Sequence, residues 1–141
     1  MNQTETESTN KALFLRLIEE GFNRGNLLVV DEIVSTHAKE HQRGNEDGVK
    51  GIKELIRTLR RWFPDFSMNA EDTVAVGDEV WARLTATGTN LGSVMHRPPT
   101  GKKISIDVID IVRVEDGKIV EHWGVPDQLG MMLQLGLVGN R

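Results

Sequence analysis

The stretch EHWGVPDQLG, residues 121–130, places a carboxylate where a strand would normally hold an apolar residue. Because side chains two positions apart on a strand share a face, Trp123, Val125 and Asp127 are predicted to point the same way. The indole and the valine would exclude water from the carboxylate and strengthen it as a base toward a proton on carbon beside a carbonyl. Asp127 also precedes a short helical segment, where aspartate is a favoured N-cap. The sequence leaves both roles open, and they can coexist.

Two histidines four residues apart, His37 and His41, fall in the segment HAKEHQ. This spacing would suit two zinc ligands on one face of a helix, but no third ligand follows at a recognisable spacing, so no metal site is expected. Histidine titrates near neutral pH and readily exchanges protons. His41 is therefore a candidate for proton exchange, whereas a surface or structural role is expected for His37.

An arginine lies within a predicted strand, in the segment VWARLTATG, where Arg83 shares a face with Trp81 and Thr85. A guanidinium among such neighbours needs a carboxylate partner or a ligand oxygen. Asp107 and Asp110 lie on the adjacent predicted strand, and their odd separation places them on opposite faces. At most one of them can serve both Arg83 and a pocket. A structural ion pair and an oxyanion-stabilising role for Arg83 both stay open.

The composition favours one ordinary globular domain. The chain has 141 residues, of which 38% are hydrophobic and 27% charged, values typical of a soluble protein with a packed core. The formal net charge of -4 argues against nucleic-acid binding, which requires a basic surface. The absence of cysteine excludes disulfides, thiolate zinc sites and a cysteine nucleophile.

The opening segment MNQTETESTN lacks a positively charged stretch followed by an apolar one. No other segment approaches the run of about eighteen apolar residues that spans a bilayer. We therefore expect a cytoplasmic, soluble protein with no membrane contact. Residues 1–9 are polar and without periodicity, so we expect a disordered tail there, followed by a single domain over residues 10–141.

Hydrophobic periodicity changes once along the chain, from a helical to an alternating pattern. The expected helices span residues 10–25, 27–34 and 51–63, and a short one follows residue 127. The expected strands span residues 68–76, 79–90, 103–114 and 118–127. Helices followed by strands predict an α+β domain in which a curved, mostly antiparallel sheet wraps around the N-terminal helices and leaves a central pocket.

Both faces of the predicted strand 103–114 are apolar. One alternating set contains Ile104, Ile106 and Val108, and the other contains Ile109 and Ile111. Because neither face would then be fully exposed to water, a second layer or a homodimer is expected.

Four segments together resemble the SnoaL-like polyketide cyclase family, within the cystatin-like, cone-shaped nuclear-transport-factor-like superfamily. The resemblance covers residues from about 11 to 136. Its segments are FNRGNLLVVDEIV, WFPDFSMNAEDTVAVGDEVWARLTATGTNLG, PPTGKKISIDVIDIVRVEDGKIVEHW and DQLGMMLQLG. The resemblance implies three helices laid into the concavity of a curved sheet, an apolar pocket open at one end, and a homodimer formed through the outer sheet face.

The resemblance also implies a chemistry. In this family an intramolecular aldol closure of a small hydrophobic carbonyl compound needs no metal and no cofactor, and a pocket aspartate near the end of the last strand handles the proton. The matching residue here is Asp127, with His41 at the pocket mouth as the second catalytic candidate. Asn90 stands where relatives carry histidine, and it could still donate a hydrogen bond to a ligand carbonyl.

The remaining expected substrate contacts are Arg83, Asp110, Trp123, Trp62 and Phe63. Two other functions of the same fold stay open. One is a noncatalytic module that binds an apolar ligand in the cavity. The other, ranked lower, is an epoxide hydrolase that would use Arg83, Asp110 and Asp127.

Overall fold

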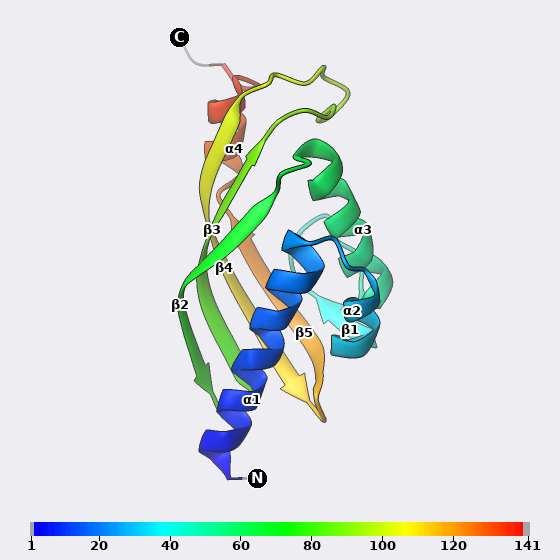
Figure 1. The fold of residues 1–141 in the computed structure, drawn as a ribbon, viewed down its shortest axis with the longest axis vertical. Coiled ribbons are helices and arrows are strands. Elements are labelled where there is room, and N and C mark those ends of the chain that lie inside the picture. Colours follow the sequence, from blue (N-terminus) through cyan, green and yellow to red (C-terminus); the bar gives the residue numbers. More distant parts are fainter. Residues whose placement is uncertain (1, 140–141) are drawn as a thin grey trace.

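Helices cover one face of a curved five-stranded sheet in the computed structural model, which describes residues 2–139 (Figure 1). From the N-terminus the elements are α1 (Gln3–Arg16), the π-helical turn η1 (Leu17–Asn23), α2 (Leu28–Ile33), β1 (Val34–Glu40), α3 (Gly48–Trp62), β2 (Ser67–Val76), β3 (Glu79–Thr89), β4 (Lys103–Glu115), β5 (Lys118–Pro126) and α4 (Gln128–Leu135). Within this range no helix has the length and apolar character that crossing a membrane requires. The cytoplasmic location stays a prediction.

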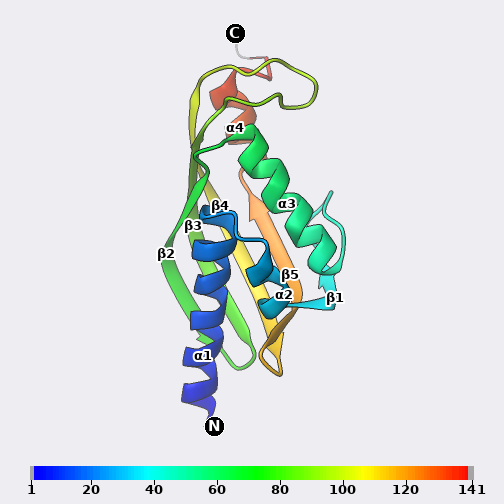
Figure 2. The same cartoon turned by 45° about the vertical axis from the view of Figure 1, so that its right-hand side comes forward.

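The sheet has the strand order β1-β5-β4-β3-β2. β1 runs parallel to β5, and every other neighbouring pair is antiparallel. Figures 1 and 2 show α1, α2 and α3 on the same side of this sheet. The predicted α+β fold, with a curved and mostly antiparallel sheet around N-terminal helices, is therefore confirmed.

The first helix begins closer to the N-terminus than expected. α1 begins at Gln3, so the prediction of a disordered tail is wrong for residues 3–9, while Met1 lies outside the described residues. Asn2 caps this helix, since its Oδ1 accepts a hydrogen bond of 2.9 Å from the backbone N–H of Glu5. Glu7 then accepts a hydrogen bond of 2.7 Å from the backbone N–H of Gly77 in the β2–β3 turn. These contacts stabilise the first part of α1, residues 3–9, which is polar and shows no apolar periodicity. A single domain over residues 10–141 stays a prediction.

The core lies between the helices and the inner face of the sheet. Every second residue of β3 and β4 is buried there, as alternation predicts. The most deeply buried large side chains include Phe14, Ile33, Ile56, Phe63 and Leu84.

One irregularity in β5 changes its alternation. The pairing register shifts between Arg113 and Val114 on β4, because their partners on β5, Glu121 and Ile119, are two residues apart. Val120 is therefore the extra residue of a β-bulge.

The bulge decides which residues of β5 face the helices. Ile119, before the bulge, is buried, and His122 and Gly124, after it, also face inward. Trp123 and Val125 consequently lie on the outer face, where Val125 is 68% exposed. The prediction that Trp123 and Val125 would enclose a carboxylate inside the pocket is therefore wrong.

Candidate active site

A cavity of about 370 Å³ lies between the helices and the inner face of the sheet. Most of its wall is apolar and comes from α1, η1, α3 and β4, with Phe14, Phe22, Leu55, Trp62, Ile106 and Val108 as representative lining residues. The loop between β1 and α3 contributes polar side chains, and Met131 of α4 also lines the cavity. Such a space suits a small, largely hydrophobic molecule.

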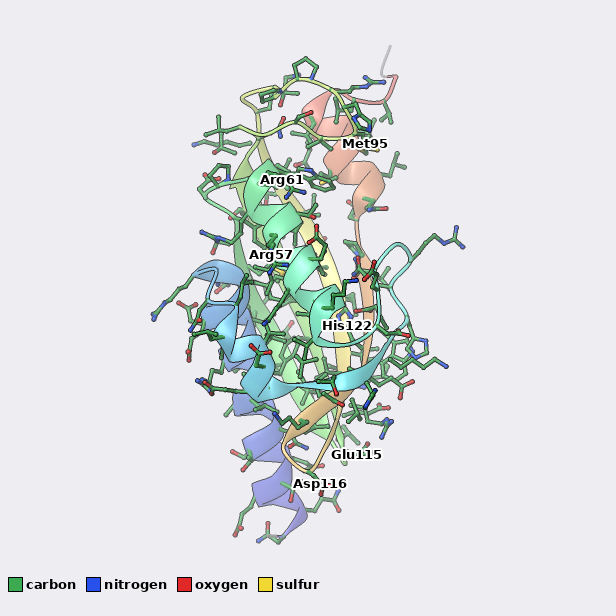
Figure 3. The ribbon with its side chains drawn as sticks, turned by 90° about the vertical axis from the view of Figure 1, so that its right-hand side faces the viewer. Arg57, Arg61, Met95, Glu115, Asp116 and His122 are labelled. Carbon is green, nitrogen blue, oxygen red and sulfur yellow. The ribbon has the colours of Figure 1, made fainter. Side chains whose placement is uncertain are left out.

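Three ionisable side chains meet at the sheet side of this cavity. Nδ1 of His122 lies 2.6 Å from Oε2 of Glu40, and Nε2 of His122 lies 3.1 Å from Oδ1 of Asp110. All three side chains are at most 12% exposed. Figure 3 shows His122 at the level of the first turns of α3. Asp110 and His122 both line the cavity, so a ligand there meets the cluster directly.

The strand pairing creates this cluster. Glu40 at the end of β1 is the parallel register partner of His122 on β5. Asp110 on β4 faces Gly124, two residue pairs beyond the pair formed by Val112 and His122. Because paired residues and residues two apart share a face, the bulge in β5 is what turns His122 toward the other two side chains.

Electrostatics favour the charged form of this histidine. Burial by itself lowers the pKa of His122, but the hydrogen bonds to Asp110 and Glu40 and their negative charges outweigh it and raise the pKa to about 10. At neutral pH His122 is therefore an imidazolium that donates one N–H to each carboxylate. Its positive charge compensates carboxylates that would otherwise be costly in an apolar wall.

Within the described part of the chain, the hydrogen bonds of the cluster leave one buried carboxylate oxygen without a partner. Oε2 of Glu40 also accepts a hydrogen bond of 3.0 Å from the backbone N–H of Gln42. Within residues 2–139, Oε1 of Glu40 is buried and has no hydrogen-bond partner. An unpaired buried acceptor costs about 1–3 kcal/mol, which is typical of sites kept for function rather than for stability.

Asp127 does not line the cavity. It is exposed, and its Oδ1 accepts a hydrogen bond of 2.9 Å from the backbone N–H of Gly130, so it is the N-cap of α4. Of the two roles that the sequence left open, the capping role is the one that the geometry provides. The expected position of Asp127 in the pocket is wrong.

His41 and Trp123 lie together on the outer sheet face. Their rings stack with centroids 4.7 Å apart and an interplanar angle of 3°. Nε2 of His41 also lies 2.6 Å from Oε2 of Glu121, and this contact together with a hydrogen bond from Arg113 lowers the pKa of Glu121. Neither His41 nor Trp123 lines the cavity, so their expected pocket contacts are not formed.

Arg83 forms an ion pair on the exposed side of the sheet. Its Nε and Nη2 lie 2.9 and 2.8 Å from Oδ2 of Asp72. The structural role is thus the one observed, with a partner other than the two aspartates considered from sequence. Asp107 is exposed and Asp110 is buried, so the two lie on opposite faces, as their odd separation predicted. Arg83, Asp110 and Asp127 are not brought together, so the arrangement required for epoxide hydrolysis is not assembled.

Asn90 organises a loop instead of contacting the cavity. It is 1% exposed, and its amide donates to the backbone oxygens of Trp62 and Gly92 and accepts two hydrogen bonds from Thr100. Phe63 is fully buried in the core beside the cavity lining. Trp62 does line the cavity, as expected.

Two residues of the cluster were missed from the sequence. Glu40 lies in HAKEHQ, whose residues do not alternate, so β1 was not predicted and its partner could not be inferred. His122 lies in EHW, inside a predicted strand, but uninterrupted alternation places it opposite to its observed face. Within residues 2–139 no group of three or more His, Cys, Asp or Glu side chains is arranged to hold a metal ion.

The fold and the cavity define a class of protein, a cone-shaped domain with a cavity between helices and a curved sheet. The sequence profile of the SnoaL-like polyketide cyclase family matches residues 12–135, and the chain belongs to this family.

Known members show what the chain is similar to. Nogalonic acid methyl ester cyclase from Streptomyces nogalater is 29% identical over 119 residues, which are 82% of this chain and 89% of that protein. Aklanonic acid methyl ester cyclase DnrD from Streptomyces peucetius is 40% identical over 60 residues, 43% of this chain and 41% of that protein. The crystal structure of IdmH, a putative polyketide cyclase from Streptomyces antibioticus, is 31% identical with a TM-score of 0.81, covering 90% of this chain and 98% of that one.

Proposed function

We propose that this chain is a cofactor-free polyketide cyclase that closes a ring in a small hydrophobic ester by an intramolecular aldol reaction, with Asp110 as the base. The observation that carries the proposal is the buried carboxylate of Asp110, held by His122 in the wall of a largely apolar cavity. The similarity to nogalonic and aklanonic acid methyl ester cyclases supports polyketide methyl esters as the substrate class.

The reaction conserves atoms and charge. The carboxylate of Asp110 removes a proton from a carbon that is acidified by a neighbouring carbonyl, and the C–H electron pair becomes an enolate. The enolate carbon forms a C–C bond with a second carbonyl carbon of the same molecule, and the electron pair of that C=O moves to its oxygen. The carboxylic acid of Asp110 then returns the proton to this alkoxide, so the product carries a hydroxyl group and the protein is unchanged.

His122 positions the base. It contacts Oδ1 of Asp110, and within residues 2–139 no hydrogen bond to Oδ2 is present, so Oδ2 is left for the substrate. Glu40 holds the other side of the imidazolium and fixes the plane of the ring. The cavity supplies proximity, because it folds a flexible substrate so that its two reacting carbons meet.

Asp110→Asn tests the proposal. Asparagine keeps the acceptor for His122 but is far too weak a base to take the proton, so turnover of nogalonic or aklanonic acid methyl ester should fall at least about 10²-fold. Asp107→Asn, the same exchange on the exposed face of the same strand, should keep wild-type turnover. Wild-type turnover by a folded Asp110→Asn variant would refute the base. Binding of both esters without turnover by the wild type would instead identify a noncatalytic binding module.

We also propose a homodimer that forms through the outer sheet face. Two rows of side chains cross this face along the strand pairing, one with Val125, Ile109 and Arg83 and the other with Trp123, Ile111 and Trp81. Ile109 and Trp81 are 40% and 46% exposed. Exposed apolar side chains gathered on one sheet face favour a partner, and a second copy presents the same rows.

A further inference from the structure

We infer that the side-chain amide of Gln42 binds the substrate carbonyl oxygen beside Asp110, and that it reaches this position because residue 124 is glycine. The inference rests on the proposed function and adds a residue that stabilises the enolate oxygen. It is carried by the space around Gly124, by the absence of other partners for Gln42, and by the way in which the backbone holds Gln42.

The absence of a side chain at Gly124 makes room for the amide of Gln42. A Cβ atom at position 124 would collide with Oε1 of Gln42 and would lie 2.9 Å from both Oδ1 of Asp110 and Cε1 of His122. The amide of Gln42 therefore occupies room that any other residue at position 124 would fill. Since the colliding atom and the two neighbours surround the same point, the amide lies directly beside the acid–base cluster.

The amide has no structural task elsewhere. Gln42 lines the cavity, and no hydrogen bond of its side chain is present within residues 2–139. By contrast, another inward-facing amide, that of Asn90, uses both its donors and its acceptor in the loop that it organises. A half-buried amide that lines a cavity without a partner is available to a ligand.

The backbone of Gln42 is fixed by the same cluster. Its N–H donates to Oε2 of Glu40, the carboxylate oxygen that also contacts His122. The preceding residue, His41, donates its backbone N–H to the carbonyl oxygen of His122 at 2.9 Å. The carbonyl oxygen of Gln42 accepts from the backbone N–H of Asn45 at 3.2 Å, which closes a turn. Gln42 is thus held in register with His122 although it lies just beyond the end of β1.

This placement suits a specific step. When Asp110 removes the proton, negative charge develops on the oxygen of the adjacent carbonyl. His122 already donates both N–H groups to Glu40 and Asp110, so it has no donor left for that oxygen. Rotation about the last side-chain bond lets Gln42 present its NH₂ group there, in a largely apolar cavity. A donor of this kind acts mainly on the transition state and hence on kcat.

Gln42→Leu tests the inference, because it removes the amide and keeps similar bulk. With nogalonic or aklanonic acid methyl ester, we expect kcat to fall about 10²-fold while KM changes little. Gln3→Leu, the same exchange on the exposed first turn of α1, should leave both constants unchanged. Wild-type kcat in Gln42→Leu, or a change in KM alone, would overturn the inference.

Gly124→Ala provides a second measurement. The added methyl group displaces the flexible end of Gln42, so kcat should fall in the wild-type background. In a Gln42→Ala background the displaced group is absent, so Gly124→Ala should cause a smaller loss, limited to the effect of the new methyl group on Asp110 and His122, which lie 2.9 Å from the added Cβ. Equal losses in the two backgrounds would show that Gly124 does not act through Gln42.

The two proposals can fail separately. Loss of turnover in Asp110→Asn with full kcat in Gln42→Leu would leave the base in place and refute the role of Gln42. Full turnover in Asp110→Asn would refute the base, and the kcat of Gln42→Leu would still decide the role of the amide. If neither ester is turned over, the change of tryptophan fluorescence on binding, to which Trp62 in the cavity wall contributes, gives Kd. An approximately tenfold weaker Kd in Gln42→Leu would support the contact, and an unchanged Kd would overturn it.

Discussion

His122 lies between two carboxylates in a cavity wall that is largely apolar. A buried charge that loses its partner is strongly destabilising, whereas the complete arrangement contributes little net stability because all its members are removed from water. Evolution of a stable core alone would favour apolar side chains at these positions. The cluster of Glu40, Asp110 and His122 is therefore best explained by the chemistry that it can perform in the cavity.

The charge of His122 predicts how stability depends on pH. The folded-state pKa is raised to about 10, whereas an exposed histidine titrates near 6.5. The stabilisation is complete below about pH 6.5 and is lost progressively as pH rises toward 10, because the unfolded chain releases its proton first. We expect the free energy of unfolding, measured by urea titration, to fall across this window by roughly 1.4 kcal/mol for each unit of the shift that is realised.

Two variants distinguish the contribution of His122 to the pH dependence of stability from the contributions of the other titrating groups. His37→Gln changes an exposed histidine on β1 and should keep the full decrease with pH. His122→Gln should be less stable at low pH and should show a much flatter profile, since the group that titrates is gone. A His122→Gln profile parallel to that of the wild type would show that His122 is not charged in the folded protein.

The secondary-structure elements show which parts of the fold can be predicted from local sequence patterns. Each boundary of β2, β3, β4 and β5 lies within one residue of its prediction, because hydrophobic alternation and glycine turns are local signals. The bulge at Val120 has no such signal, and one extra residue reverses the face of every later side chain in β5. On regular β4 the sequence thus correctly placed Asp107 and Asp110 on opposite faces, although it did not say which of them faces the pocket, whereas on β5 His122 and Asp127 were misplaced.

The cap of α4 gives a prediction at this level. Asp127→Ala should lower the free energy of unfolding by about 1 kcal/mol, because the backbone N–H of Gly130 loses its acceptor. Asp127→Asn should be nearly neutral, since asparagine is also a good N-cap. Both variants should keep wild-type turnover, because Asp127 is exposed and does not line the cavity. Thermal unfolding and turnover measurements on the two variants test these expectations. An inactive but stable Asp127→Asn protein would identify Asp127 as the base.

At the level of the assembly, the two sheet faces have different tasks. The inner face forms the core and the cavity, and the outer face, which carries exposed apolar side chains such as Ile109, Trp81 and Val125, is not covered by a helix in Figures 1 and 2. The sequence indicated this division, because both alternating sets of β4 are apolar. It could not say which set faces inward, since that depends on how the helices pack and not on alternation.

The proposed homodimer predicts a matched pair of variants. Ile109→Lys places a charge at the centre of the outer rows, between Val125 and Arg83, and burying that charge in an interface is costly. Sedimentation equilibrium at micromolar concentration should give twice the chain mass for the wild type and the chain mass for Ile109→Lys. Leu28→Lys makes the same kind of exchange at a 73% exposed position on α2, away from the sheet, and should stay dimeric. A monomeric wild type, or an Ile109→Lys variant that is as dimeric as Leu28→Lys, would place the interface elsewhere or exclude it.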